Sequence, residues 1–399
     1  MRTLLLALVL AAASKPATPE AWVGSWACSQ QIPEPQNALA PKDLENATLR
    51  QIVHLPIGGS ALRVHLSNAF GSAPLTLISV SIARPRSAHS AAIDPATNHG
   101  LTFAGHADVT IPAGAEYISD PLPYITAPGD DVAISIFYRD PPERQTGHPG
   151  SRATSYIAHG NLASAPDLPG AKTVDHWYQI SAIDVLTGDA ALAVVTLGDS
   201  ITDGHGATTN GNNRWPDILA RRLPHVGVLN AGIGGNRLLD DGLGPNALAR
   251  FDRDVLAQTG VRYVIVLEGV NDLGTALRHG PVAPEEHAAL VRRILDAYDQ
   301  LITRAHAHHL RIYGGTITPY AGSDYYHPDA AAEADRQQIN AWIRAPGHFD
   351  EVVDFDKALR DPAHPDRLRP EFDSGDHLHP SPAGYAAMAR AIPLAFFSH

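Results

Sequence analysis

The sequence predicts two structural units: an all-β sandwich or jelly roll over residues 20–187, and a three-layer α/β/α domain with a five-stranded parallel sheet over residues 188–399. The first reason is length, because 399 residues exceed what a single core normally holds. The second is a change of pattern near residues 187–190, where short β-rich segments give way to alternating strand and helix patterns. The third is that 44% of the residues are hydrophobic, which is enough for packed globular structure.

The first 19 residues resemble a secretory signal peptide. The segment MRTLLLALVLAAASKPA has one arginine, then an apolar run, then small residues. A transmembrane helix needs about 20 apolar residues, and no later segment supplies them. We therefore expect a secreted or periplasmic protein without a membrane span.

Residues 20–187 contain a series of short segments with the features of β-strands, separated by Gly, Pro, Asn and Asp. In one of them Leu62, Val64 and Leu66 alternate with Arg63 and His65, which is the period of a strand with one buried face. The predicted strands are residues 48–55, 61–70, 75–83, 108–112, 131–139, 151–160 and 177–186. We expect Cys28, the only cysteine, to be a buried side chain that forms no intrachain disulfide.

The second unit contains five near-continuous apolar runs, as parallel strands covered on both faces require. Between the third and the fourth run, residues 284–309 place Leu290, Ile294 and Leu301 on one face of a predicted helix. The five predicted strands are residues 191–198, 226–232, 263–269, 310–319 and 351–356.

Polar residues and glycines follow several of these parallel strands. Ligands of open parallel sheets bind beyond the carboxyl ends of the strands, so we expect the segments after the strands to meet there. Ser200 follows the first strand, the glycine-rich segment 230–237 follows the second, and Asn271 follows the third. Asp376 and His379 come after the last strand, three residues apart.

These groups suit acyl transfer. A serine hydroxyl such as that of Ser200 needs a base, which His379 can supply, and Asp376 can fix the tautomer of the histidine. The backbone N–H groups of Ser200 and Gly235 and the side-chain amide of Asn271 are the candidate donors of an oxyanion hole. This chemistry requires neither a cofactor nor a metal, and we expect none.

The same segments resemble the conserved blocks of the SGNH hydrolases, also called GDSL esterases and lipases. The resemblance extends over about 200 residues, in order and spacing, and implies a flavodoxin-like fold, a Ser-His-Asp triad and an acyl-enzyme. A preceding β-sandwich also resembles secreted two-domain bacterial members, which implies an acylated carbohydrate as substrate. The matching blocks are Gly198-Asp199-Ser200, Gly235, Gly269-Val270-Asn271-Asp272 and Asp376-His377-Leu378-His379.

The sequence therefore predicts a secreted serine esterase that removes short acyl groups, such as acetyl, from a carbohydrate or another small ester. Two alternatives remain open: a lipase or general carboxylesterase, and a non-catalytic carbohydrate-binding protein on the same scaffold. The net charge of −12 disfavours nucleic acid as a partner, because nucleic acids bind basic surfaces.

Other interpretations of single residues are weaker. A metal site would use the carboxylates and imidazoles of residues 373–379, but no third block of sequence supplies a further ligand. Glu268 and Asp272 as a glycosidase pair would leave Ser200 and His379 unexplained. We expect Asp199 and Asp272 to be structural. Seven residues lie on predicted loops at the rim of the sheet, where they either contact substrate or pack within the loops: Arg214, Trp215, Asn236, Arg237, Tyr320, Tyr325 and Tyr326.

Overall fold

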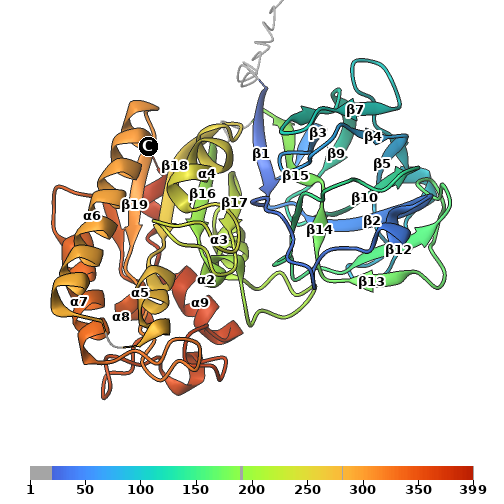
Figure 1. Ribbon diagram of the computed structural model, residues 1–399. Helices are drawn as coiled ribbons and strands as arrows, with labels where there is room; N and C mark the ends of the chain where they lie inside the picture. The colour runs from blue at the N-terminus through green and yellow to red at the C-terminus, as the bar shows by residue number, and fades with distance from the viewer. Residues whose placement is uncertain (1–19, 189–191, 281, 399) are drawn as a thin grey trace, which may run out of the picture.

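The computed structural model describes residues 20–188, 192–280 and 282–398, so the predicted signal peptide lies outside the described residues. Figure 1 shows a sheet-rich N-terminal region beside a C-terminal region in which helices surround a sheet. The predicted fold class is confirmed: antiparallel strands come first, and a five-stranded parallel sheet follows. The domain boundary at residue 188 stays a prediction.

The N-terminal region is built from two main antiparallel sheets. The first has the order β1-β15-β3-β8, with β9 also paired to β3, and the second has the order β13-β12-β2-β10-β5-β6. The strands of the first sheet are β1 (Ala21–Ala27), β15 (Ile180–Thr187), β3 (Gly59–Ser67), β8 (Glu116–Ile118) and β9 (Leu122–Thr126). Those of the second are β13 (Lys172–Val174), β12 (Ser155–His159), β2 (Ala47–His54), β10 (Asp131–Tyr138), β5 (Ser79–Ala83) and β6 (His99–Gly100). Two small ladders pair β4 (Leu75–Leu77) with β7 (Val109–Ile111) and β11 (Gly147–His148) with β14 (Trp177–Tyr178).

Three predicted strands of the N-terminal region are divided or begin later in the structure, and the predicted strands 310–319 and 351–356 end earlier, at Gly315 and Val353. The segment 75–83 is two strands with different partners, because β4 pairs with β7 and β5 pairs with β10. The segment 177–186 is interrupted at Gln179, which has a left-handed φ of 56°. The strand expected from residue 151 begins only at Ser155, because Arg152 is also left-handed, with a φ of 49°.

The strands of the parallel sheet follow the order β17-β16-β18-β19-β20. Within this sheet, β16 comes first in the chain and lies between β17 and β18, the second and third strands. This is the flavodoxin-like order, in which later strands are added on the other side of the first one. Ligands of such sheets bind at this switch point, beyond the carboxyl ends of the strands. The strands are β16 (Leu192–Gly198), β17 (Val226–Gly232), β18 (Val261–Leu267), β19 (Arg311–Gly315) and β20 (Glu351–Val353).

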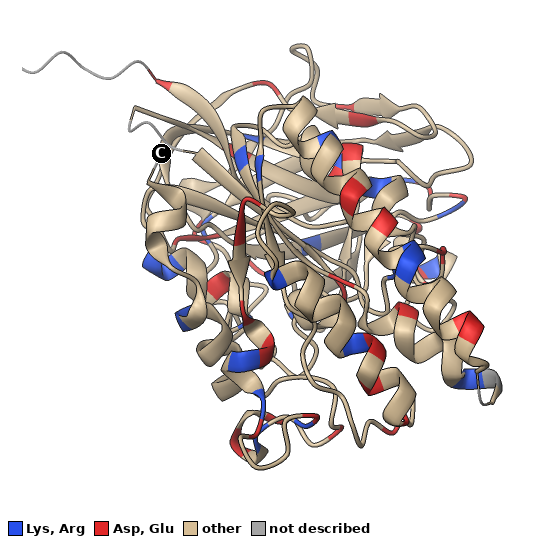
Figure 2. Cartoon of the chain, turned by 90° about the vertical axis from the view of Figure 1, so that its left-hand side faces the viewer, with Lys and Arg blue, Asp and Glu red and all other residues tan. Residues whose placement is uncertain are grey.

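Helices cover both faces of the parallel sheet, with α3 packed against α9 and α6 packed against α7 (Figure 1). The predicted helix over residues 284–309 is α6, whose buried face includes Ile294, Ala297 and Leu301. The outward faces of the helices carry acidic and basic residues interspersed (Figure 2). The α-helices are α2 (Ser200–Asp203), α3 (Trp215–Arg222), α4 (Ala247–Phe251), α5 (Val270–Ala276), α6 (Pro284–Ala307), α7 (Ala330–Arg344), α8 (Phe355–Leu359) and α9 (Pro382–Ala391), after α1 (Pro41–Leu44) in the sandwich. None of the helices in the described ranges is long and apolar enough to cross a membrane.

The two regions meet along β1, a strand that the sequence analysis did not anticipate. The N–H of Gly24 donates a 2.9 Å hydrogen bond to the carbonyl of Thr259, and Cys28 forms a bridge with Asn230 at the edge of the parallel sheet. A Cβ on Gly227 would lie 1.9 Å from the carbonyl oxygen of Gly24, so the backbones approach too closely for a side chain. Cys28 is buried at this contact and is free, as predicted.

Candidate active site

Ser200 lies on a sharp turn between β16 and α2. The carboxylate of Asp199 accepts a 2.8 Å hydrogen bond from the N–H of Ile201 and so caps the helix, the structural role expected for this residue. The helix ends one turn later at Gly204, with a φ of 100°. A Cβ on Gly198 would lie 2.2 Å from Oγ1 of Thr202, so the turn requires glycine there. This geometry places Ser200 directly beyond the end of β16, at the switch point of the sheet.

The three residues predicted to form a triad are hydrogen-bonded in a line. Oγ of Ser200 lies 2.7 Å from Nε2 of His379, and Nδ1 of His379 lies 2.6 Å from Oδ2 of Asp376. Because a carboxylate only accepts hydrogen bonds, Nδ1 carries the proton and Nε2 is free to accept from the serine hydroxyl. Ser200 and His379 are 7% and 4% exposed, so the pair is largely shielded from bulk water.

Asp376 is held in its ionised form. Partial burial of the carboxyl group opposes ionisation, but hydrogen bonds from His379 outweigh that effect and keep the pKa of Asp376 well below its usual value. Oδ1 accepts from the backbone N–H groups of Leu378 and His379 at 3.0 and 2.8 Å. The carboxylate is therefore both charged and fixed in direction.

The candidate oxyanion donors come from the loops after β16, β17 and β18. Nδ2 of Asn271 donates a 2.8 Å hydrogen bond to the carbonyl of Asn236, next to Gly235. Gly235 itself has a φ of 71°, a left-handed conformation that favours glycine. The carboxylate of Asp272 accepts from the N–H groups of Leu238 and Leu239 at 2.9 and 3.0 Å, so it ties the first turn of α5, which carries Asn271, to the segment after β17, which carries Gly235.

Arg250, which the sequence analysis missed, binds the carboxyl ends of the neighbouring strands β16 and β17 and the residue after β18. Its guanidinium donates to the carbonyl of Gly198 at 3.0 Å and to the carbonyl of Ala231 at 2.6 Å, and lies 3.4 Å from Oε1 of Glu268. The side chain is fully buried. A lone arginine on a short helix gives no sequence signal of this role, because the three partners at the strand ends lie 18 or more residues away in the chain.

Two buried carboxyl groups beneath the turn were considered as a glycosidase pair. Glu268 and Asp272 are 1% and 5% exposed, and their partners are Arg250 and backbone amides. Burial raises the pKa of Glu268 well above its usual value, that of Asp272 to about 6, and that of the neighbouring Asp199 to about 7. These groups support the loops from inside and do not face a substrate.

The seven residues for which substrate contact and loop packing are the alternatives have different environments. Trp215 and Tyr320 are fully buried, and Tyr326 holds Asn271 through a hydrogen bond from its hydroxyl. Tyr325 is half exposed, and its ring stands edge-on to that of His379 at 5.8 Å between centroids. The others are held by neighbours: Arg214 pairs with Asp217, Asn236 binds Arg250 and Pro245, and Arg237 bonds to Asp241.

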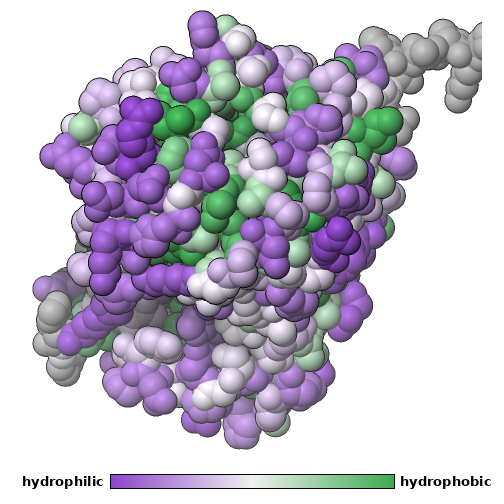
Figure 3. Space-filling model, turned by 90° about the vertical axis from the view of Figure 1, so that its right-hand side faces the viewer, coloured by the Kyte–Doolittle hydropathy of each residue, from purple (hydrophilic) through white to green (hydrophobic). Residues whose placement is uncertain are grey.

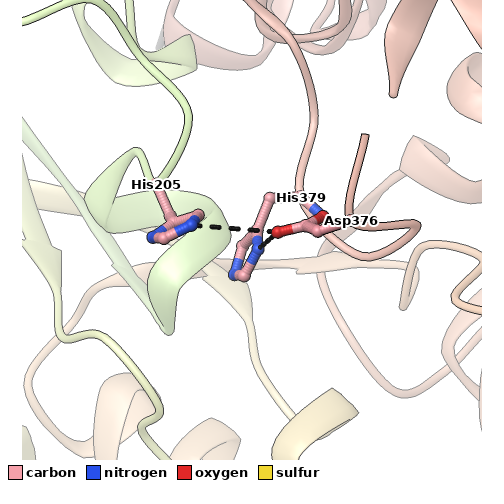
Figure 4. Close-up of side chains that lie close together, drawn as sticks. All are labelled: His205, Asp376 and His379. Atoms are coloured by element: carbon pink, nitrogen blue, oxygen red, sulfur yellow. Dashed lines mark hydrogen bonds and ion pairs between the residues drawn. The ribbon is translucent and has the colours of Figure 1, made fainter. Parts of the chain in front are cut away.

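His205 is a further residue at the site that the sequence analysis did not single out. Its ring lies against that of His379 with 4.0 Å between centroids, and its Nε2 is 3.8 Å from Oδ2 of Asp376 (Figure 4). Its position five residues after Ser200, within the same block, was the available signal.

The residues weighed as a metal site form two separate pairs. Nδ1 of His377 lies 2.6 Å from Asp373, and His377 is more than half exposed. The other pair is Asp376 with His379, and both ring nitrogens of His379 already have partners. Of these four residues, Asp376 and His379 are linked to Ser200 by hydrogen bonds, whereas Asp373 and His377 pair with each other.

A hydroxyl, an imidazole and a carboxylate bonded in this order, at the switch point of an open α/β sheet, are typical of ester hydrolases. Residues 196–387 match the model of the GDSL-like lipase/acylhydrolase family. The α/β domain is therefore similar to this family, also called the SGNH hydrolases, and the match supports a carboxylic ester hydrolase.

Solved structures with detectable similarity align with about half of the chain. A GDSL-like lipase from Bacteroides thetaiotaomicron is 22% identical over 51% of this chain and 87% of its own, with a TM-score of 0.39. An acetyl xylan esterase is 21% identical over 50% of this chain and 97% of its own, with a TM-score of 0.38. No curated protein matches the sequence.

Proposed function

We propose that the protein is an exported serine esterase that removes short acyl groups, such as acetyl, from a carbohydrate, with Ser200, His379 and Asp376 as its catalytic triad. The observation that carries the proposal is the unbroken hydrogen-bonded line from the serine hydroxyl to the aspartate carboxylate. Export is inferred from the leader-like sequence of residues 1–19.

The first half-reaction forms an acyl-enzyme. Oγ of Ser200 attacks the ester carbonyl carbon while its proton passes to Nε2 of His379. The carbonyl oxygen becomes an oxyanion, which the N–H groups of Ser200, Gly235 and Asn271 stabilise. The C–O bond to the alcohol then breaks, and His379 returns the proton to the departing oxygen.

The second half-reaction uses water in place of the alcohol. His379 takes a proton from water while the water oxygen attacks the acyl carbon, and the oxyanion forms again. The bond between the acyl carbon and Oγ of Ser200 then breaks, His379 returns the proton to Ser200, and the acid leaves. Throughout, ionised Asp376 stabilises the imidazolium that forms twice in each cycle.

Two side chains beside the site support small substrates. Leu243, nearly half exposed, lies over Gly235, since a Cβ on that glycine would be 2.9 Å from the leucine Cδ1. Because Gly235 would bind the acyl oxygen, Leu243 provides a short apolar surface for an acyl chain. Tyr325 lies beside His379, where the leaving alcohol departs, and an exposed aromatic ring suits the apolar face of a sugar.

The test is turnover of p-nitrophenyl esters of increasing acyl length, together with acetate release from acetylated xylan. We expect the acetyl ester to be the best substrate and xylan to release acetate. Ser200→Ala should abolish turnover, whereas Ser164→Ala, which removes an exposed hydroxyl from the sandwich, should not change it. A preference for long chains would favour a lipase. Binding of xylan without any turnover would favour the non-catalytic alternative, and either result would contradict the proposal.

A further inference from the structure

The β-sandwich reaches the candidate active site through the loop between β11 and β12. Arg152 on this loop has a left-handed φ of 49°, a conformation that non-glycine residues adopt at a cost and that concentrates at functional sites. Its Nη2 lies 3.1 Å from Nδ1 of His205, and its carbonyl accepts a 2.8 Å hydrogen bond from the N–H of Asn210. The guanidinium is thus directed from one region of the protein onto a ring in the other.

The loop is held against the Ser200 turn by further contacts. Nε2 of His148 lies 2.9 Å from Oδ1 of Asp203 in α2, and both side chains are almost fully buried. Gly150 has no room for a side chain, because a Cβ there would lie 1.7 Å from Oδ2 of Asp203. Arg152 therefore projects from a loop that is fixed against the helix of the nucleophile.

His205 is fixed at both its backbone and its ring. Its N–H donates to the carbonyl of Ser200 at 2.9 Å, and the hydroxyl of Tyr385 donates to its carbonyl at 2.6 Å. Because guanidinium only donates hydrogen bonds, Nδ1 must accept from Arg152 and Nε2 must carry the proton that faces Asp376. Burial, together with the charges of His379 and Arg152, lowers the pKa of His205 to about 4, so the ring is neutral at ordinary pH.

We propose that Arg152 is a positioning residue for the esterase reaction, which holds the ring of His205 against the ring of His379 and so makes the β-sandwich part of the catalytic unit. The inference rests on the proposed function of the triad. It also gives the sandwich a role other than sugar binding. Its outer face in Figure 3 is largely hydrophilic with smaller hydrophobic areas, and Tyr117 is the one exposed aromatic side chain among its described residues.

The first experiment compares Arg152→Gln with Arg139→Gln, which removes the same charge from an exposed side chain of the sandwich. We expect Arg152→Gln to lower kcat several-fold with little change in KM, because the ring of His379 loses a positioned neighbour while substrate contacts remain. Arg139→Gln should match the wild type. Arg152→Lys keeps the charge without the planar donors, so its kcat should also fall.

The second experiment asks whether Arg152 acts through His205. In a His205→Phe background, which keeps an aromatic ring but removes Nδ1, Arg152→Gln should lower kcat much less than it does in the wild type. Equal losses in both backgrounds, or an Arg152→Gln variant identical to Arg139→Gln, would overturn the inference. Ser200→Ala separates the two claims: if it stays active the proposed triad fails, whereas failure of the Arg152 tests alone leaves the triad intact.

Discussion

The hydroxyl of Tyr326 donates a 2.6 Å hydrogen bond to Oδ1 of Asn271, and both side chains are buried. Oδ1 and Nδ2 of the amide lie in one plane on opposite sides of the Cβ–Cγ bond, so the bond to Oδ1 determines where Nδ2 points. One N–H of Nδ2 is used by the carbonyl of Asn236, which leaves the other for a ligand. The orientation of the proposed oxyanion donor is therefore set by a tyrosine more than 50 residues away in the chain.

Asn271→Ala should lower kcat by about 10²–10³-fold, because it removes one donor to the oxyanion while leaving substrate binding largely intact. Steady-state kinetics with p-nitrophenyl acetate measure the effect, with KM expected to change little. A loss of kcat of less than about threefold would show that Asn271 does not bind the oxyanion.

Tyr326→Phe should lower kcat by about tenfold, since the amide of Asn271 loses the bond that fixes its orientation. Tyr320→Phe is a matched control, because the buried hydroxyl of Tyr320 has no hydrogen-bond partner in the described part of the chain. Adding Tyr326→Phe to Asn271→Ala should cause no further loss of kcat. Full additivity of the two changes would mean that the tyrosine acts elsewhere.

Asp376→Asn should lower kcat by about 10⁴-fold, because an amide can donate to Nδ1 and favours the wrong tautomer of His379. Asp373→Asn is the control. Asp373 lies three residues before Asp376 in the sequence, but it pairs with the exposed His377. The low pKa of Asp376 means that it stays ionised over the working range, so the acidic limb should not report its titration. Comparable kcat values for the two variants would contradict this assignment.

The sequence analysis identified the proposed triad because its members lie in short blocks with their own local structure. Ser200 follows an apolar run and lies two residues after Gly198, and Asp376 lies three residues before His379. Nearby residues therefore determine the turns that carry them. The parallel strands were recognisable for a similar reason, because strands buried on both faces are continuously apolar.

The residues that escaped prediction depend on tertiary contacts. Arg152, His205 and Arg250 have partners 53 or more residues away or on other elements, and no periodicity marks them. Strand β1 was missed because its partner β15 lies at the other end of the sandwich region, so nearby residues do not indicate the pairing. No pattern in the sequence marks Arg152 and Gln179 as left-handed, so the shortening of the predicted strands 151–160 and 177–186 could not be foreseen.

His65 should make the stability of the protein depend on pH. Burial alone would lower its pKa, but hydrogen bonds to Asp184 and Glu116, at 3.0 and 2.9 Å, outweigh burial and raise the pKa to about 9. Because the folded pKa exceeds the unfolded value of about 6.5, the stabilisation is complete below that pH and is lost as the pH rises through 9.

His65→Gln should therefore lower the free energy of unfolding by roughly 1–3 kcal/mol at pH 6 and by much less at pH 10. Urea denaturation at the two pH values measures the difference. His54→Gln, which breaks the more exposed pair with Asp131 on the same sandwich, should have a small effect at both. A destabilisation by His65→Gln that is the same at pH 6 and pH 10 would contradict a charged histidine.

The most direct test of the proposed mechanism is to identify the nucleophile chemically. The protein is treated with a fluorophosphonate, which phosphonylates activated serines, and the modified peptide is located by mass spectrometry. We expect a single adduct on Ser200 that is absent in Ser200→Ala and forms far more slowly in His379→Ala. An adduct on another residue, with esterase turnover retained by Ser200→Ala, would contradict the account.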